Sequence, residues 1–284
     1  MYKQYIQQQV TQALNEDLNF QTAEDGDITA QLIPESQQAV ARVITRQNAI
    51  ICGIEWVNET IKQVDDSLSI EWRVQDGDKV TRDQVLFFVR GSARSILTAE
   101  RTALNFMQAL SGTATATNQY VADVLSIGSK TKILDTRKTI PGLRFAQKYA
   151  VTCGGGQNHR VGLFDAYLIK ENHIQAAGGI AQAVTRAHQL NPGKTVEVEV
   201  ESMDELQQAI DAGADIVMLD NFDVNQTKEA MTLADGQVKI EASGNMDGDK
   251  FKAYAQLNVD YISIGGLTKH VNAIDLSMRF IDEE

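Results

Sequence analysis

The fold is decided by the stretch Val196-Glu-Val-Glu-Val200 and by the apolar runs that follow it, Asp215-Ile-Val-Met-Leu219, Val238-Lys-Ile240 and Tyr261-Ile-Ser-Ile264. From Asp215 on, these runs recur about every 22 residues, close to the length of one strand, one helix and two short loops. Helical patterns separate or follow the runs, and such an alternation predicts parallel strands joined by right-handed crossovers. Two earlier runs extend the series, Lys132-Ile-Leu134 and Ala166-Tyr-Leu-Ile169. Helices are expected over 175–190, 203–212, 248–257 and 271–281.

Two architectures fit this alternation, an open doubly wound sheet and a (β/α) barrel. No Gly-x-Gly-x-x-Gly follows the first run, and no Walker A sequence occurs in the chain. We therefore expect an incomplete (β/α) TIM-like barrel, because the chain holds fewer than the eight units of a full barrel.

The region before the barrel has a different rhythm. Leu68-Ser-Ile-Glu-Trp-Arg-Val74 alternates apolar and polar residues, as a half-buried strand does, and a second strand is expected over 85–89. A helix over 95–110 follows and is predicted to stop at Ser111-Gly112. This pattern predicts an N-terminal α+β (barrel-sandwich-like) domain over 1–112, packed on a barrel domain over 113–284. The extreme C-terminus is expected to pack back on the N-terminal domain.

Charge and composition exclude several classes of protein. The chain has 284 residues and a net charge of −12, so nonspecific binding to nucleic acid or to an anionic membrane is not expected. Its two cysteines form no metal-ligand spacing, and no stretch reaches the roughly 18 apolar residues of a membrane span. A cytoplasmic enzyme without nucleic-acid or membrane partners is the expectation.

Polar or glycine residues follow every predicted barrel strand. In (β/α) barrels the reactive groups lie at the carboxyl ends of the strands, so these residues are candidates for one site. They are Asp135-Thr-Arg-Lys-Thr139, Lys170, Glu199, Asp220-Asn221, Ser243-Gly-Asn245 and Gly265-Gly266.

The alternating glutamates Glu197, Glu199 and Glu201 allow two interpretations. On an edge strand they would form a solvated acidic face. Inside a covered sheet they would need cations or a metal, because a buried unpaired carboxylate is costly. The available cations favour a site for a polyanion bound with a divalent metal, and they are Arg101, Arg137, Lys138, Arg160 and Lys170.

Glycines mark two candidate anion sites. Gly154-Gly-Gly156 precedes His159-Arg160, and its backbone N–H groups are suited to approach an anion. Ser243-Gly244 and Gly265-Gly266 occupy the phosphate position common in barrels, and a helix expected from Val271 would add a favourable N-terminus.

Several motifs, taken in order, resemble quinolinate phosphoribosyltransferase, and the match covers nearly the whole chain. Glu171 and Thr152 depart from the family pattern, which often has Asp and a basic residue at these positions. The motifs are Glu16-Asp17, Gly26-Asp-Ile-Thr29, Thr98-Ala-Glu-Arg-Thr-Ala-Leu-Asn105, Leu134-Asp-Thr-Arg-Lys-Thr-Ile-Pro-Gly-Leu-Arg144, Gly154-Gly-Gly-Gln-Asn-His-Arg160, Leu168-Ile-Lys-Glu-Asn-His173, Val196-Glu-Val-Glu-Val200, Asp215 to Phe222, Glu241 to Asn245 and Ile262 to Thr268.

The resemblance implies a pentosyltransferase of de novo NAD synthesis. Quinolinate and phosphoribosyl diphosphate would give nicotinate mononucleotide, diphosphate and CO2. Quinolinate would be bound by Arg137, Lys138, His159 and Arg160, with Lys170 between the two substrates. The 5′-phosphate would be held by residues after the last two strands, namely Ser243, Gly244, Asn245, Gly265 and Gly266.

The same resemblance implies the cofactor, the catalytic set and the assembly. Glu199 and Asp220 would hold Mg²⁺ and the ribose hydroxyls, no organic cofactor is needed, and Lys138 and Lys170 would complete the catalytic residues. Arg101 would reach the site of the partner in a homodimer, with a higher oligomer left open.

Three other functions also fit these sequence features. A paralogous phosphoribosyltransferase associated with molybdate transport has the same scaffold and another acceptor. A non-catalytic phosphate-binding barrel is the second. A biotinyl- or lipoyl-type carrier is the third, suggested by Asp76-Gly-Asp-Lys-Val80.

Overall fold

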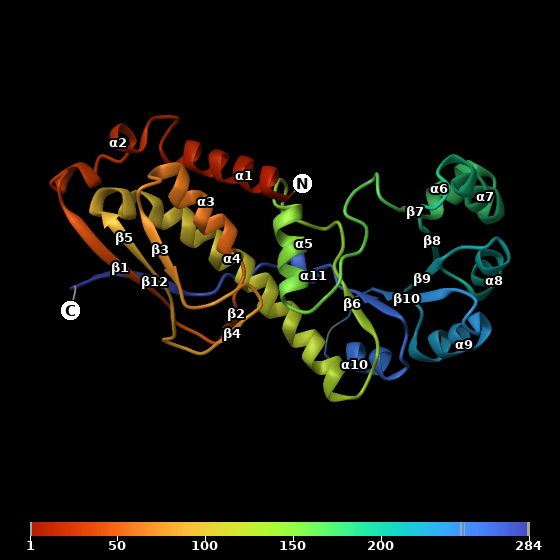
Figure 1. The fold of residues 1–284 in the computed structure, drawn as a ribbon. Helices are drawn as coiled ribbons and strands as arrows, with labels where there is room; N and C mark the ends of the chain where they lie inside the picture. The colour runs from red at the N-terminus through yellow and green to blue at the C-terminus, as the bar shows by residue number, and fades with distance from the viewer. Residues whose placement is uncertain (1, 245, 247, 283–284) are drawn as a thin grey trace. The chain divides into compact units, whose positions relative to one another are not determined.

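The chain forms two compact units. The structure, a computed structural model, describes residues 2–244, 246 and 248–282. The first unit comprises Met1–Asn118, Thr139–Gly155 and Thr268–Glu284, and the second comprises Gln119–Lys138 and Gly156–Leu267. The helix α4 (Ala93–Ser126) runs from the first unit into the second (Figure 1).

A four-stranded antiparallel sheet forms the centre of the first unit, in the order β12-β1-β5-β3. A separate two-stranded ladder joins β2 (Ala49–Ile50) to β4 (Lys79–Val80). The sheet strands are β1 (Gln38–Thr45), β3 (Ser69–Trp72), β5 (Val85–Ser92) and β12 (Leu276–Ile281), and the other elements of this unit are α1 (Tyr2–Asp17), α2 (Ala23–Gly26), the 3-10 helix η1 (Ala30–Leu32), α3 (Ile54–Val64) and α5 (Arg144–Cys153).

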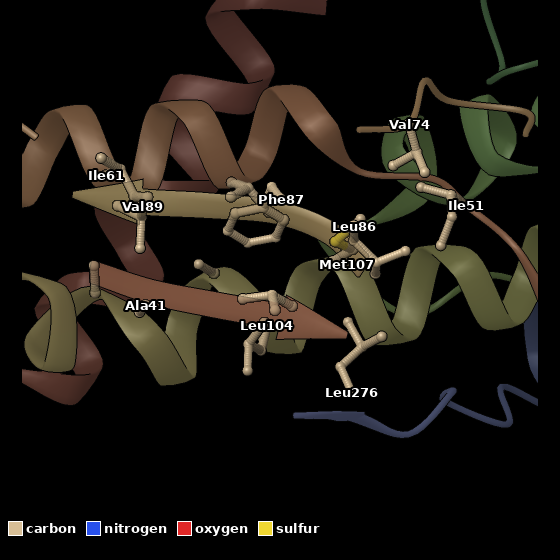
Figure 2. Close-up of a cluster of buried hydrophobic side chains, with 14 of the residues drawn as sticks. Ala41, Ile51, Ile61, Val74, Leu86, Phe87, Val89, Leu104, Met107 and Leu276 are labelled. Atoms are coloured by element: carbon tan, nitrogen blue, oxygen red, sulfur yellow. The ribbon is translucent and has the colours of Figure 1, made fainter. Parts of the chain in front are cut away.

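The core of the first unit lies between this sheet and the helices α3 and α4. Figure 2 shows Phe87 and Val89 of β5 among Leu104 and Met107 of α4, with Leu276 of β12 at the side. Met107 is fully buried and Phe87 is 2% exposed. Each such side chain contributes roughly 1.5–3 kcal/mol through burial, so this cluster is a main source of the unit's stability.

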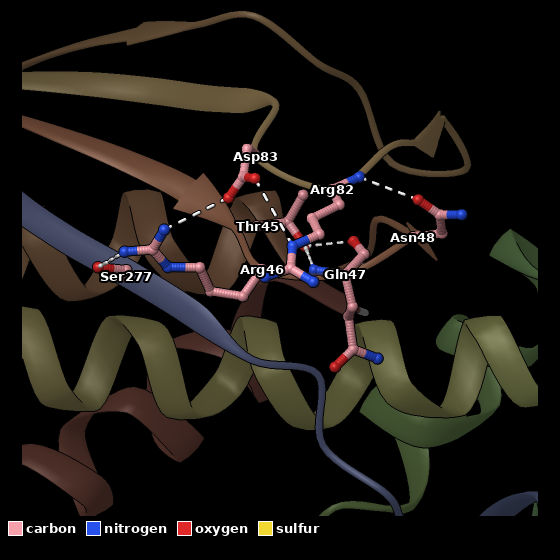
Figure 3. A network of polar contacts seen from close by, with 7 residues as sticks. All are labelled: Thr45, Arg46, Gln47, Asn48, Arg82, Asp83 and Ser277. Carbon is pink, nitrogen blue, oxygen red and sulfur yellow. Dashed lines mark hydrogen bonds and ion pairs between the residues drawn. The ribbon is translucent and has the colours of Figure 1, made fainter.

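The prediction of a helix over 271–281 is wrong, because β12 is a strand that pairs antiparallel with β1. Leu276 and Met278 face the core in alternation with polar residues, which is the period of a strand and not of a helix. The side chain of Arg46 lies 3.3 Å from Asp83 and 3.5 Å from Ser277, and its backbone N–H donates to Asp275 O at 2.8 Å (Figure 3). These contacts fix the start of β12 beside the end of β1.

The predicted stop of the helix at Ser111-Gly112 is also wrong, since α4 continues to Ser126. The two residues serve packing instead. A Cβ atom at Gly112 would lie 2.2 Å from Asn272 O, so only glycine allows the segment before β12 to pass there. The hydroxyl of Ser111 accepts from Cys52 N at 2.9 Å and donates to Cys52 O at 3.1 Å.

Six parallel strands form the sheet of the second unit, in the order β6-β11-β10-β9-β8-β7. This confirms the (β/α) architecture, and within the described chain β6 and β7 remain its two outer strands, as an incomplete barrel requires. One further parallel bridge joins Leu134 of β6 to Gln157. The strands are β6 (Lys132–Leu134), β7 (Tyr167–Ile169), β8 (Val196–Val200), β9 (Ile216–Asp220), β10 (Lys239–Ser243) and β11 (Tyr261–Ser263).

Helices follow the strands and cover the sheet, with α7, α8 and α9 side by side along it in Figure 1. The single helix predicted over 175–190 is two helices, because Gly178 and Gly179 have φ of +88° and +133° and break it. Among the described residues no helix is long and apolar enough to cross a bilayer. The helices are α6 (Glu171–Ala177), α7 (Ile180–Leu190), α8 (Met203–Asp211), α9 (Val224–Ala234), α10 (Gly248–Gln256) and α11 (Gly266–Lys269).

Candidate active site

The carboxyl ends of the parallel strands bring the predicted residues of the second unit to one edge of the sheet. Asp220 ends β9 and pairs in register with Ser243, which ends β10. Glu199 pairs with Met218 one strand further along, and Lys170 directly follows β7. Because all six strands run the same way, these residues share the edge at which barrel enzymes carry their chemistry.

Glu199 and Lys170 form an ion pair at this edge. The Glu199 side chain is largely buried, whereas the Lys170 side chain is 44% exposed. A pair this accessible contributes little to stability. Both charges are therefore accessible to a bound substrate.

Arg137 and Arg160 line a cavity of about 580 Å³ together with Lys170, and α7 supplies part of its apolar wall. The Nε atoms of both arginines are buried, and neither has a hydrogen-bond partner among the residues that the structure describes. Burial lowers the pKa of Arg160, and the positive charge of Arg137 lowers it further, while Glu197 and Asp165 act in the opposite direction. Two neighbouring guanidinium groups with open donors favour an anion, and carboxylates bind such groups bidentately.

His159 directly precedes Arg160, on a segment tied to the end of β6. Its backbone N–H donates to Asp135 Oδ1 at 2.9 Å, and Asn158 Nδ2 donates to Asp135 Oδ2 at 2.6 Å. The ring nitrogen Nδ1 accepts from Arg160 N at 2.8 Å, and Nε2 lies 2.8 Å from Glu197 Oε2. Both ring nitrogens thus face protein groups, so the ring orients its neighbours.

Two carboxylates that the sequence did not assign to the site complete this cluster. Glu197 on β8 and Glu241 on β10 have side chains 4% and 0% exposed, and Glu241 Oε2 lies 3.6 Å from His159 Nε2. Burial raises the pKa of Glu241 to about 8, and the charge of Glu197 adds to the increase, while His159 opposes it. Alternation with valine marked Glu197 as unusual, but its partner on β10 follows only from the three-dimensional arrangement.

The glycines after β10 and β11 each lie close to a lysine side chain. A Cβ atom at Gly265 would lie 3.0 Å from Cδ and 3.7 Å from Nζ of Lys138. At Gly244, with φ of +129°, it would lie 3.7 Å from Nζ of Lys250 on α10. The sequence reasoning missed Lys250, which follows in the first turn of α10. This geometry suits a phosphate group between backbone and ammonium groups.

The predicted contribution of a helix N-terminus at Val271 to the phosphate site is wrong. No helix begins at Val271, because the residues before β12 are irregular, so its N-terminus cannot favour an anion. The short α11 begins at Gly266 instead. Asn245 lies outside the residues that the structure describes.

Arg101 belongs to the first unit, apart from the other predicted residues. It lies on α4, with a side chain 61% exposed and 4.0 Å from the Glu100 carboxylate. It lines a cavity of about 310 Å³ with Asp17, Thr102 and Asn105.

Glu199 and Asp220 offer carboxylate oxygens from neighbouring strands, the donors that Mg²⁺ prefers. Both side chains are partly accessible. The donor set therefore fits a magnesium ion that keeps several waters.

Family models and relatives match nearly the whole chain. Residues 27–111 match the N-terminal domain of quinolinate phosphoribosyl transferase, and residues 113–279 match its C-terminal domain. The solved nicotinate-nucleotide pyrophosphorylase of Francisella tularensis superposes with a TM-score of 0.93 at 53% identity, covering 98% of this chain and 97% of that one.

Two curated relatives carry names of the same enzyme family. A tobacco (Nicotiana tabacum) protein named quinolinate phosphoribosyltransferase [decarboxylating] 2b, mitochondrial, is 41% identical over 91% of this chain and 78% of its own. A Bacillus subtilis protein named probable nicotinate-nucleotide pyrophosphorylase [carboxylating] is 38% identical over 89% of this chain and 87% of its own. The chain therefore belongs to the quinolinate phosphoribosyltransferase family.

Proposed function

We propose that this chain transfers the phosphoribosyl group of phosphoribosyl diphosphate to quinolinate, giving nicotinate mononucleotide, diphosphate and CO2, in the cytoplasm. The observation that carries the proposal is the arginine pair. Arg137 and Arg160 line one cavity and keep buried Nε donors without protein partners in the described chain. A dicarboxylate supplies one carboxylate for each guanidinium group and offsets their repulsion. Family membership identifies quinolinate as that dicarboxylate.

Lys170 and Glu199 prepare the space between the two substrates. Their ion pair joins an ammonium group that lines the arginine cavity to a carboxylate on β8, the neighbour of the strand that ends in Asp220. When a second anion displaces Lys170 from Glu199, that anion compensates the positive charge of Lys170 in place of Glu199. We assign Lys170 to the contact between quinolinate and the diphosphate.

Glu199 and Asp220 stabilise the developing positive charge on the ribose. As diphosphate leaves, C1 gains oxocarbenium character, and fixed carboxylates at the strand ends favour that charge. Their oxygens would also hold Mg²⁺, which when bound offsets the charge of the departing diphosphate.

The phosphate end of the second substrate fits the glycines below Lys138 and Lys250. Lys138 lies close to the backbone at Gly265 and Lys250 close to the backbone at Gly244, so backbone N–H and ammonium groups are available to the same phosphate. Ser243 and Gly266 flank these glycines at the same edge of the sheet.

Decarboxylation needs no nucleophile from the protein. Once the pyridine nitrogen carries the ribose, its positive charge stabilises the carbanion left at C2 when the C2–carboxylate bond breaks. A proton from solvent water then bonds to C2 and completes nicotinate mononucleotide. The role of the arginines is then to orient the carboxylate that departs. We expect no covalent intermediate on any side chain.

Incubation with both substrates and Mg²⁺ tests the function. CO2 release from the C2 carboxylate that requires both substrates supports it, and nicotinate in place of quinolinate is the matched control. Diphosphate release with another aromatic acceptor, and no CO2 from quinolinate, would favour the paralogous enzyme associated with molybdate transport.

The proposal includes a homodimer in which Arg101 completes the partner's site, and it is supported by the exposure of Arg101 on α4. Mixing Arg101→Ala with Glu199→Ala should restore part of the activity, because some mixed sites regain both residues. Each variant alone should stay inactive under the same mixing protocol. No recovery after confirmed subunit exchange would argue that each site belongs to one chain.

A further inference from the structure

We infer that Glu241 is a positioning residue for dicarboxylate binding: in its protonated form it holds the Glu197–His159 pair, and through His159 it fixes Arg160 at the cavity. This inference rests on the proposed function, because it concerns the pocket assigned to quinolinate. Glu241 itself lines no part of that cavity.

Proton placement in the cluster follows from its geometry. His159 Nδ1 accepts a hydrogen bond from Arg160 N, so the proton of a neutral imidazole is on Nε2. That nitrogen lies 2.8 Å from Glu197 and 3.6 Å from Glu241, so Glu197 is the nearer carboxylate. The same proton excludes a metal ligand at Nε2, although the three side chains lie close enough together to suggest a metal site.

Glu241 must then carry a proton of its own. Its side chain is fully buried, and a hydrogen bond with Glu197 raises its pKa, as expected where a protonated Glu241 donates to Glu197. Two ionised carboxylates beside one imidazole would leave at least one buried negative charge uncompensated, which burial and repulsion both oppose. The raised pKa of Glu241, about 8, agrees with this argument.

Among the described residues, the groups that shift the pKa of Glu241 include no lysine or arginine. β8 presents Glu197, the 157–160 segment presents His159, and β9 presents Met218 in register. On the other side β11 presents Tyr261 in register and Ser263, whose hydroxyl favours the ionised form. Lys239, two residues earlier on β10, is at the surface and pairs with Asp260 at 2.7 Å.

The cluster connects to the substrate through one hydrogen bond. Nδ1 of His159 holds the backbone N–H of Arg160 at 2.8 Å, and the Arg160 guanidinium lines the cavity. Ionisation of Glu241 adds a buried charge beside Glu197 and disturbs this connection. The quinolinate KM should therefore rise above pH 8, with little change in kcat or in the KM for phosphoribosyl diphosphate.

Glu241→Gln tests the inference, because the amide keeps the shape of the neutral acid and does not ionise. Wild type and variant are compared from pH 7 to 9.5 by kcat, by the KM for each substrate and by calorimetric quinolinate binding. We expect the variant to stay within about threefold of wild type at pH 7 and to lose the alkaline rise in quinolinate KM. Glu229→Gln, at an exposed position on α9, is the control and should keep the wild-type profile.

Glu241→Ala removes the contact at every pH. Its quinolinate KM should increase by about 10- to 100-fold from pH 7 upward, since small misplacements of binding groups have effects of this size. An alkaline rise in Glu241→Gln equal to that of wild type would overturn the inference, and so would a flat wild-type profile. Absence of CO2 release by wild type would instead contradict the proposed function, and quinolinate binding would still test Glu241.

Discussion

Each unit contains a carboxyl group whose pKa burial raises, Asp76 in the first and Glu241 in the second, and the two are held in opposite ways. In the first unit, Asp76 Oδ1 accepts from Gly53 N at 2.9 Å and Ile54 N at 3.2 Å, and Tyr149 donates to Oδ2 at 2.8 Å. In the second unit, the Glu241 carboxyl group is fully buried and shares a hydrogen bond with another carboxyl group, that of Glu197. Burial is the largest cause of the raised pKa in both cases.

The comparison separates two uses of a buried carboxyl group. Asp76 caps the start of α3 and ties it to α5, so its hydrogen bonds are structural. Glu241 lies beside a histidine that orients a cavity arginine. A raised pKa alone therefore does not identify a functional acid, and the state of its oxygens is more informative.

The largest expected effect is on substrate binding by the arginine that His159 orients in the second unit. Arg160→Ala should lower kcat/KM by about 10²- to 10⁴-fold, because it removes a charged donor aimed at a carboxylate. Its melting temperature should stay near that of wild type, since the guanidinium Nε has no protein partner in the described chain. Lys138→Ala should behave alike, and near-normal kcat/KM in either variant would contradict the site.

Asp76→Ala should lower the stability of the protein and leave its activity unchanged, the reverse of Arg160→Ala. Loss of three hydrogen bonds removes the acceptor of two backbone N–H groups and one contact of the Tyr149 hydroxyl, which should lower the free energy of unfolding by about 2–4 kcal/mol. Urea denaturation measures this, and kcat/KM of the remaining folded protein should be close to wild type. A catalytic defect without loss of stability would erase the distinction between the two acids.

The pH dependence of stability sharpens the comparison further. The pKa of Glu241 is raised from 4.5 to about 8 on folding, so the folded state binds more protons between these values. Stability contributed by this group is therefore complete below about pH 4.5 and is lost as pH rises towards 8. Melting curves should show Glu241→Gln gaining stability over wild type at pH 8 relative to pH 5. An equal difference at both pH values would mean that Glu241 is already ionised at pH 5.

Tyr149→Phe should produce the smallest effect. It removes one donor to Asp76 Oδ2 and should cost about 1 kcal/mol in urea denaturation, with unchanged kinetics. The Trp56 ring lies tilted beside the Tyr149 ring, with 5.8 Å between centroids, and the phenyl ring keeps that contact. A loss as large as that of Asp76→Ala would show that the hydroxyl dominates the cap.

Sequence patterns predicted the strands well because each barrel strand is a short apolar run. The same reasoning failed at 271–281, where a strand pairs with β1, although Leu276 and Met278 alternate as strand residues do. It also failed at Gly112, which only the close passage of Asn272 explains. Both errors arise from contacts between residues far apart in the chain.

The candidate site shows the same limit. Lysines and arginines beside strand ends were recognisable from their positions. The orientation of His159, the partnership of Glu197 with Glu241 and the position of Lys250 over Gly244 depend on distances between strands. No pattern along the chain contains those distances.

The pairing of β12 with β1 also bears on how the protein is made. β1 leaves the ribosome early, but its edge partner, residues 276–281, is synthesised only after the entire second unit. Until then the edge of β1 is unpaired and open to association with other nascent chains. Final closure of the first unit is thus a late step that waits for synthesis of the second unit, and chaperone dependence during synthesis should be concentrated there.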